Sequence, residues 1–519
     1  MRFLNTRAVL AAGLALAAGA AACNNSDITS LNQNPNSPED APAGAVFTQA
    51  TQTAVGRWLG SGYSLRQMEF LTQHLAEVQY PDEDRYARIR ASDTQGYFQG
   101  GNGAYATSLE DFRQVVKKGE KVSSPAISAP ATIMQQWEFG YITDNWGDVP
   151  YSQALAGDSA GGAVLPAYDA QQAIYNGMFS KLTAASTALA SPGPQSLGGA
   201  DPIYGGSTVA WRKFANSLRA RYAMRIVNVD PTKANAELTA ALSAPGGVFT
   251  SNADMAKLNW PGDGVFDNPW ASNFKTRDDH RMSKTFVDIL LARNDPRLPV
   301  FAMPTVDFQN GKPGAAEYAG QPNGLDAATA GTYFNSTSRP GAVFYPGVTA
   351  YGNYGGSGAS QPAYLMTYAE VAFIKAEAAE RSMGGLTPAQ APGFYNAGIT
   401  ASMNQWGITD AAAIADYLAQ PSVAYAGGVA GLKQIAVQKW IALYTDGGQA
   451  WFEWRRTCQA SIAPGPSAIF TTVPRRLEYP TGEISVNGEN VNAAKARQGP
   501  DNMQTRVWWD KAGVAPTCP

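Results

Sequence analysis

Apolar residues recur at steps of three and four along much of the chain, a spacing that predicts amphipathic helices. The stripes Trp211 to Ile226, Leu365 to Ala379 and Leu432 to Leu443 show it most clearly. The same spacing predicts helices over residues 44–59, 63–78, 104–121, 129–144, 168–190, 232–243, 280–292, 388–405 and 410–419. We therefore expect a mainly α fold.

The predicted helices 363–383 and 388–405 are joined by Met383-Gly384-Gly385, a typical helix C-cap and turn. Helix pairs of this kind resemble tetratricopeptide units. No strict repeat of the sequence is visible, so the expected architecture is a helical scaffold of degenerate tetratricopeptide-like pairs.

Three long stretches, 244–279, 299–362 and 457–519, lack helical periodicity and are rich in Gly, Pro, Asn and aromatic residues. Loops of this length usually carry function or are disordered, and the aromatic content favours order. The strand-like pieces 342–345 and 483–486 predict only a few small β-hairpins.

The N-terminus is typical of an exported protein. Arg2 and Arg7 precede an apolar stretch that is too short to span a bilayer, so residues 1–22 are predicted to be a signal peptide. Ala20-Ala21-Ala22-Cys23 resembles a bacterial lipobox, which predicts lipidation of Cys23; an ordinary cleavage site with an incidental cysteine is the alternative. Residues 23–42 then form a polar, Pro-bearing tether, and residues 43–519 a single domain.

Composition narrows the candidate chemistry. Among 519 residues only 16% are charged and the net charge is −3, so no nucleic-acid partner is expected and an uncharged, hydroxyl-rich ligand is favoured. Three cysteines and two histidines without zinc spacing predict neither a metal site nor a cofactor. A structural calcium ion is not indicated, because residues 263–267 lack the acidic ladder of a calcium loop. Cys458 and Cys518 either form a disulfide or remain free thiols.

Eight short motifs follow one another along nearly the whole chain after Cys23. They are Asn34-Pro35-Asn36, Thr143–Tyr151, Trp211–Leu218, Asp295–Leu298, Tyr368–Val371, Gln438–Leu443, Pro474–Leu477 and Val507–Asp510. In this order they resemble the SusD/RagB family of nutrient-binding outer-membrane lipoproteins. Cys458 departs from the pattern, since a glycine is usual after Arg456-Thr457.

The resemblance implies a mostly helical protein at the outer surface of the outer membrane. Such proteins cover a TonB-dependent barrel transporter and capture oligosaccharides, or in some branches oligopeptides; they bind and do not catalyse. Two other readings of the sequence stay open. One is a lipid-anchored glycoside hydrolase that uses carboxylates at 82–84 or 278–279, and the other is a purely structural helical-repeat adaptor.

Ligand contacts are expected from loop aromatics beside polar residues, because sugar rings offer apolar faces and a rim of hydroxyl groups. The predicted ligand-binding residues are Tyr80, Asp84, Tyr86, Trp270, Asn273, Tyr351, Asn353 and Tyr354. The motif residues Asp144, Asn145 and Trp146 are expected to be structural. Arg455 and Arg456 are expected to pair with Glu453, Glu483 or Asp510.

Overall fold

Several helices begin where the sequence supplies a capping side chain. Ser207 accepts a hydrogen bond from the backbone N–H of Ala210 at the start of α9 (Thr208–Arg225). Asp230 does the same for Lys233 in α10 (Pro231–Leu242), whose first residue is a proline. These side chains satisfy N–H groups that have no partner within the helix, so they define where each helix begins.

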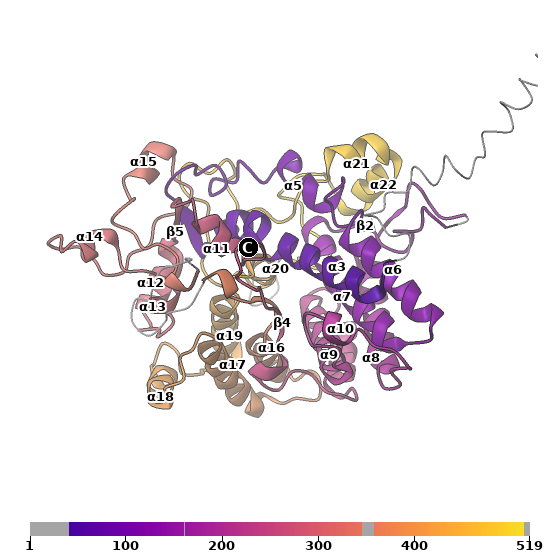
Figure 1. Ribbon diagram of the computed structural model, residues 1–519. Helices are drawn as coiled ribbons and strands as arrows, with labels where there is room; N and C mark the ends of the chain where they lie inside the picture. The colour runs from indigo at the N-terminus through magenta and orange to yellow at the C-terminus, as the bar shows by residue number, and fades with distance from the viewer. Residues whose placement is uncertain (1–40, 160, 345–357, 513–519) are drawn as a thin grey trace, which may run out of the picture.

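The computed structural model describes residues 41–159, 161–344 and 358–512. The chain is mainly α-helical there, with three small antiparallel strand pairs (Figure 1). The remaining helices of the N-terminal half are α3 (Ala43–Trp58), the π-helix η1 (Ser61–Met68), α4 (Glu69–Leu71), α5 (Ala91–Phe98), α6 (Ser108–Lys121), α7 (Pro125–Trp146) and α8 (Gln171–Ala188). Those that follow α10 are α11 (Pro269–Phe274), α12 (Lys284–Leu291), α13 (Leu298–Phe301), α14 (Val306–Gln309), α15 (Ala327–Gly331), α16 (Tyr368–Glu380), α17 (Ala391–Gln405), α18 (Ala411–Ala419), α19 (Gly428–Ala442), α20 (Gly447–Thr457), α21 (Thr481–Val486) and α22 (Gly488–Gln498).

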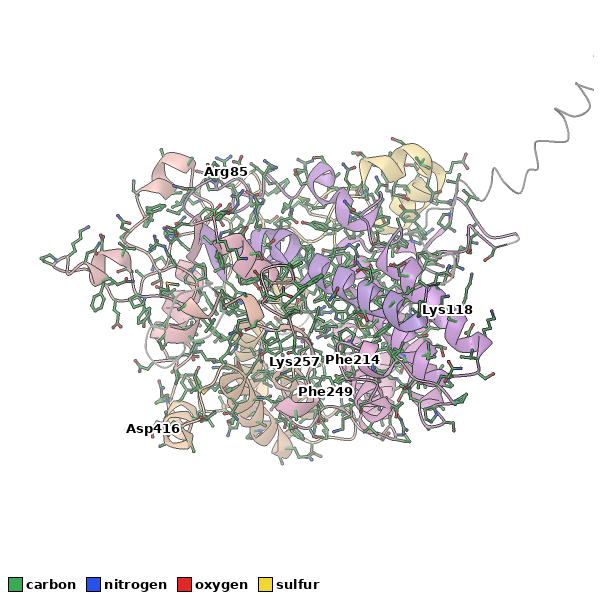
Figure 2. All side chains as sticks on the ribbon, in the orientation of Figure 1. Arg85, Lys118, Phe214, Phe249, Lys257 and Asp416 are labelled. Atoms are coloured by element: carbon green, nitrogen blue, oxygen red, sulfur yellow. The ribbon has the colours of Figure 1, made fainter. Side chains whose placement is uncertain are left out.

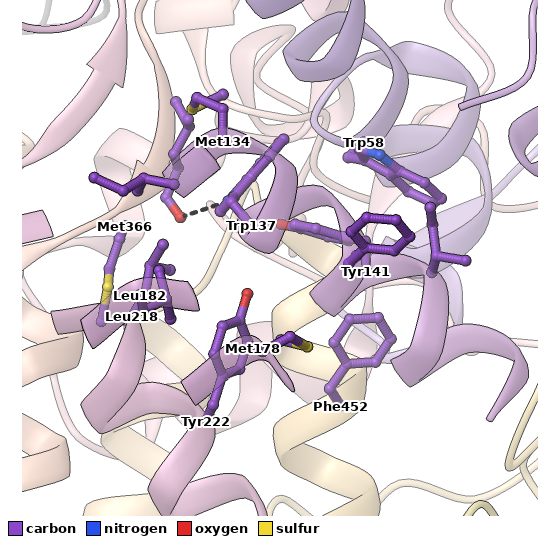
Figure 3. Close-up of a cluster of buried hydrophobic side chains, with 14 of the residues drawn as sticks. Trp58, Met134, Trp137, Tyr141, Met178, Leu182, Leu218, Tyr222, Met366 and Phe452 are labelled. Atoms are coloured by element: carbon purple, nitrogen blue, oxygen red, sulfur yellow. Dashed lines mark hydrogen bonds between the residues drawn. The ribbon is translucent and has the colours of Figure 1, made fainter. Parts of the chain in front are cut away.

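Consecutive helices of the N-terminal half pack on one another, as expected for helix pairs. Contacts join α6 to α7, α7 to α8, α8 to α9 and α9 to α10, while α3 lies against α6. Figure 3 shows part of this core, with labelled side chains from α3, α7, α8 and α9 among others. Trp58 stacks on Tyr141 with ring centroids 5.2 Å apart. Gly140 of α7 permits close approach, because a Cβ there would lie 2.3 Å from the hydroxyl oxygen of Tyr222 on α9.

A second core lies between α16, α17 and α19, in the lower middle of Figure 1. Gly398 of α17 faces the ring of Phe373 on α16, and a Cβ at this glycine would come within 2.8 Å of that ring. The small residue therefore sets the distance between the two helices. No helix among the described residues is both long and apolar enough to cross a membrane.

Each strand pair is a separate two-stranded antiparallel sheet that holds two segments of the chain together. The pairs are β1 (Leu75–Glu77) with β5 (His280–Met282), β2 (Val149–Pro150) with β3 (Tyr168–Asp169), and β4 (Ala256–Leu258) with β6 (Ala363–Met366). In the first pair Glu77 lies opposite His280. This pairing brings the loop after β1 beside residues 276–279.

Several sequence-based boundaries are wrong where a strand replaces the end of a predicted helix. The helices predicted over 63–78 and 280–292 lose Leu75–Glu77 and His280–Met282 to the β1·β5 pair. The helix predicted from residue 363 starts at Tyr368, because Ala363–Met366 pairs with β4. The two strand-like pieces are also wrong: Ala342–Phe344 is a 3-10 turn, and 483–486 lies within α21.

Candidate functional site

The loop after β1 holds one tyrosine ring in solvent. The backbone N–H of Val78 donates to the carbonyl of Asp279 (2.8 Å), one residue beyond the last β1·β5 pair. The chain then turns at Tyr80, whose φ is +57° and whose residue surface is 70% exposed. A left-handed conformation is uncommon for a bulky residue and points to a constrained loop.

This loop lines a cavity of about 960 Å³. Residues 78–83 and Arg88 contribute from the loop, Arg66 from η1, residues 276–279 from the segment before β5, and Ala327 and Gly331 from α15. In the common view of Figures 1 and 2, the loop residue Arg85 and α15 lie at the same edge of the molecule. Segments from three separate regions of the sequence, 66–88, 276–279 and 327–331, therefore meet at one site.

Every charged side chain that lines this cavity has an oppositely charged partner in the same chain. The pairs are Arg66–Glu83 (2.8 Å), Arg277–Asp279 (2.8 Å), Asp82–Arg85 (3.3 Å), Arg88–Asp93 (3.4 Å) and Asp278 with Arg281 (3.2 Å) and Arg339 (2.5 Å). The cavity thus presents hydrogen-bond donors and acceptors together without a block of one charge. This suits a polar, uncharged ligand.

The carboxyl groups around the cavity differ in ionisation. Burial raises the pKa of Asp84 to about 7, although the side chain of Asn323 and the backbone of Gly324 donate to it. Burial and the nearby Glu83, Asp84 and Asp279 raise the pKa of Glu77, whose two carboxylate oxygens have no hydrogen-bond partner among the described residues.

The pKa of Asp279 is lowered instead of raised. Burial alone would raise its pKa, but the hydrogen bond and charge of His280, together with Arg277, hold the pKa well below its usual range. Asp279 is therefore ionised at neutral pH and acts as a hydrogen-bond acceptor.

The structure separates the predicted ligand-binding residues into four groups. Tyr80 lies at the cavity. Asp84, Tyr86 and Trp270 are not among its lining residues and their side chains are buried, which argues against direct ligand contact by these three. Trp270, for example, donates from Nε1 to the carbonyl of Leu59 (3.1 Å) and packs against Phe344. Asn273 is half-buried on α11 and does not line the cavity. Tyr351, Asn353 and Tyr354 lie outside the described residues.

Sequence reasoning missed the arginines of this cavity. Arg66 lies within a predicted helix, Arg88 lies at the end of the loop, and Arg277 precedes Asp278 and Asp279, which the sequence offers only as hydrolase carboxylates. No local signal identifies them as neighbours of Tyr80. Only the β1·β5 pairing and the position of α15 bring them together.

The motif residues of α7 hold the scaffold together. The carboxylate of Asp144 accepts hydrogen bonds from the Tyr175 hydroxyl (2.6 Å) and from Nε1 of Trp509 (2.7 Å). Trp146 is buried and donates from Nε1 to the carbonyl of Glu478 (2.9 Å). Their expected structural role is consistent with this buried network.

The paired arginines of α20 are also internal. Arg456 forms ion pairs with Glu453, as expected, and with Glu377 of α16 (2.6 Å). Arg455 donates to the backbone carbonyls of Arg475 and Asp144, both at 2.5 Å, and Glu483 accepts from the Tyr168 hydroxyl (2.7 Å) instead. These contacts link α20 to α7, α16 and the C-terminal loops.

Cavities also occur elsewhere among the described residues, and two of them are large enough to hold a small ligand. One, of about 510 Å³, has mostly apolar walls between α5, residues 163–166 and α21. The other, of about 620 Å³, is lined by Trp454, Cys458 and Arg475. Cys458 is disulfide-bonded; Cys23 and Cys518 lie outside the described residues, so the pairing with Cys518 stays a prediction. The described residues contain no group of three or more His, Cys, Asp or Glu side chains that could hold a metal ion.

Comparisons with known proteins agree on the fold. The model of a SusD-like family, described as "Starch-binding associating with outer membrane", matches residues 35–480. A solved structure titled as a chitin-binding protein is 27% identical, has a TM-score of 0.76, and aligns over 91% of this chain and 100% of its own.

A chitin-binding SusD homologue from Flavobacterium johnsoniae is 25% identical, with a TM-score of 0.74 over 90% of this chain and 99% of its own. A SusD homologue from Bacteroides uniformis is 24% identical, with a TM-score of 0.77 over 91% and 100% of the two chains. The search of curated proteins finds no match.

Proposed function

We propose that this chain, which belongs to the SusD-like family described as starch-binding and associating with the outer membrane, captures oligosaccharides for uptake. The proposed site is the cavity lined by Tyr80. The exposed Tyr80 ring beside a cavity of about 960 Å³ is the observation that carries the proposal. An aromatic ring can take the apolar face of a sugar, while the paired arginines and carboxylates exchange hydrogen bonds with its hydroxyl groups.

The proposal is binding without turnover. A glycoside hydrolase needs one carboxylic acid that stays protonated near neutral pH and a second carboxylate across the scissile bond. Asp279 is held ionised by His280 and Arg277, which suits a hydrogen-bond acceptor rather than a general acid. The pKa of Glu77 is raised, as a general acid requires, but its side chain is fully buried and does not line the cavity.

Capture can be measured by isothermal titration of the mature chain with maltoheptaose, chitohexaose and an uncharged hexapeptide. We expect at least one of the two sugars to bind. Tyr80→Ala should weaken that binding by about tenfold, since a stacked ring contributes roughly 0.5–1.5 kcal/mol beyond its buried area.

Phe308→Ala is the matched control, because Phe308 is an exposed ring (44%) on α14 that does not line the cavity. Binding of the peptide but of neither sugar would show that the ligand class is wrong. Equal weakening by both substitutions would show that the site is wrong. Shortened sugar in the titration mixture, lost on Asp82→Asn or Asp279→Asn, would favour the hydrolase.

The delivery step is part of the same proposal. Export through residues 1–22 and lipidation of Cys23 would anchor the chain to the outer membrane, where it would pass its ligand to a TonB-dependent barrel transporter. The family's association with the outer membrane supports this location. Cys23→Ala, expressed with the signal peptide intact in cells that lack the transporter, should leave the membrane fraction and lose labelling by a palmitate analogue. Retention of both would refute the anchor.

A further inference from the structure

The loop that carries Tyr80 stores backbone strain at two positions. Tyr80 and Tyr86 have φ values of +57° and +66°, in the left-handed region. Each such conformation costs a non-glycine residue free energy and persists only where surrounding contacts determine it. The loop therefore needs contacts with the rest of the fold that hold this backbone conformation.

Asp84 provides three contacts of this kind. Its Oδ1 accepts a hydrogen bond from Nδ2 of Asn323 (2.7 Å), and its Oδ2 accepts from the backbone N–H groups of Gly324 (3.0 Å) and Glu77 (3.4 Å). The side chain is buried and does not line the cavity. Asp84 thus ties its own loop to β1 and to the segment before α15.

Asn323 continues the connection. Its Nδ2 also donates to the carbonyl of Leu75 (2.8 Å), and its Oδ1 accepts from the hydroxyl of Ser283 (2.6 Å). Three residues after Asn323, Asp326 caps α15 through the backbone N–H groups of Ala328 and Thr329. The cavity-lining residues of the loop and of α15 are consequently joined through one buried side-chain pair, Asp84 and Asn323.

We propose that Asp84 is a positioning residue that fixes the distance between the Tyr80 loop and α15, and through it the affinity for ligand, without touching the ligand. This inference rests on the proposed function of the cavity. It assigns Asp84 a role different from the direct ligand contact that the sequence suggested.

Asp84→Asn tests the proposal, because it puts a side-chain N–H against one of the three N–H donors and breaks at least one hydrogen bond. Asp446→Asn is the matched control: Asp446 is also buried, burial likewise raises its pKa to about 7, and it does not line the cavity. The ligand is whichever of maltoheptaose and chitohexaose binds the wild-type chain. Titration is carried out well below the unfolding midpoint of each variant.

Asp84→Asn should raise Kd by about tenfold, equivalent to about 1.4 kcal/mol, whereas Asp446→Asn should leave Kd unchanged. Asn323→Ala should weaken binding similarly. The double variant should have a Kd no higher than that of the single variant with the higher Kd, because both changes break the same connection between Asp84 and Asn323. Amide hydrogen exchange of residues 78–86 should accelerate in Asp84→Asn and Asn323→Ala but not in Asp446→Asn.

A lowered unfolding midpoint with wild-type Kd in both Asp84→Asn and Asn323→Ala would show that Asp84 is only structural and would overturn the inference. If Asp84→Asn does not fold, Asn323→Ala alone decides by the same two measurements. A wild-type chain that binds neither sugar overturns the proposed function first, and the role assigned to Asp84 with it. A wild-type chain that binds, with variants that bind equally well, overturns the role of Asp84 alone.

Discussion

Tyr80 and Tyr86 share a backbone conformation but differ in the position of the ring. Both have positive φ, yet the Tyr80 ring is exposed at the cavity and the Tyr86 ring belongs to the main core. The backbone conformation therefore costs both residues a similar amount, while only Tyr86 recovers free energy by burial. This difference gives opposite expectations for one substitution at the two positions.

Tyr80→Gly should leave the protein as stable as the wild type or raise its free energy of unfolding by up to about 1 kcal/mol, since glycine adopts positive φ without a Cβ clash. Tyr86→Gly should lower the free energy of unfolding by about 3–5 kcal/mol, as for other buried aromatic truncations. Urea unfolding of both variants measures this. A stability loss of similar size at Tyr80 would mean that its ring packs against the fold.

The buried carboxyl of Asp446 makes a second residue-scale expectation. Burial raises its pKa to about 7 in the folded protein, despite the nearby Arg221 and hydrogen bonds from the backbone of Gln449 and the Tyr141 hydroxyl. Its pKa is near 3.9 in an unfolded chain, so between these values the folded state binds the proton more tightly. Stability contributed by this group is present below about pH 4 and is lost as pH rises to about 7.

Between pH 5 and pH 8 deprotonation of Asp446 should therefore lower the free energy of unfolding of the wild type by about 2–3 kcal/mol. Asp446→Asn should lack this part of the decrease. The amide resembles the protonated carboxyl and does not titrate. Urea unfolding at the two pH values measures the difference. Parallel pH dependence of the two proteins would mean that Asp446 is ionised throughout this range.

The sequence predicted both Tyr80 and Trp270 as ligand contacts, but only Tyr80 is exposed at the cavity. Both are aromatic residues beside polar neighbours in segments without helical periodicity. Trp270, however, lies in a short helix, and its ring packs against Phe344 and Tyr444, which come from distant parts of the chain. Tertiary contacts of this kind leave no mark on the local sequence.

At the scale of elements, α20 shows which helices a periodic pattern finds and which it misses. Apolar residues at steps of three and four identified α9 and α19, each of which also carries residues that are not buried. Every residue of α20 is buried, including Arg455, Arg456 and Glu453, so burial in this helix does not follow the polarity of the residues. Its polar residues are satisfied by ion pairs within the core instead.

Arg456→Met should lower the free energy of unfolding by about 3–5 kcal/mol, because it leaves Glu377 and Glu453 buried without this partner. Lys284→Met, which removes an exposed pair with Asp288 on α12, should cost less than about 1 kcal/mol. Chemical unfolding distinguishes the two. A similar small loss in both variants would mean that neighbouring Lys439 and Arg381 compensate for Arg456.

At the scale of the whole molecule, the fold class could be predicted because it rests on many helices and on ordered motifs spread along the chain. The cavity could be predicted only in part. Its lining residues come from η1, the loop after β1, the segment before β5 and α15, and two short strands bring them together. Those strands were predicted as helix ends, so the neighbourhood of Tyr80 could not be assembled from sequence.

The compensated charges of the cavity have a consequence for the medium in which the protein works. Salt shortens the range of electrostatic forces from about 10 Å at 0.1 M to about 3 Å at 1 M, but an uncharged ligand facing paired charges has little long-range attraction to lose. The Kd for an oligosaccharide should change by less than about twofold between these salt concentrations. Titration in the two buffers measures it, and a tenfold weakening would contradict it. A receptor of this kind would capture its ligand equally well in fresh water and in brine.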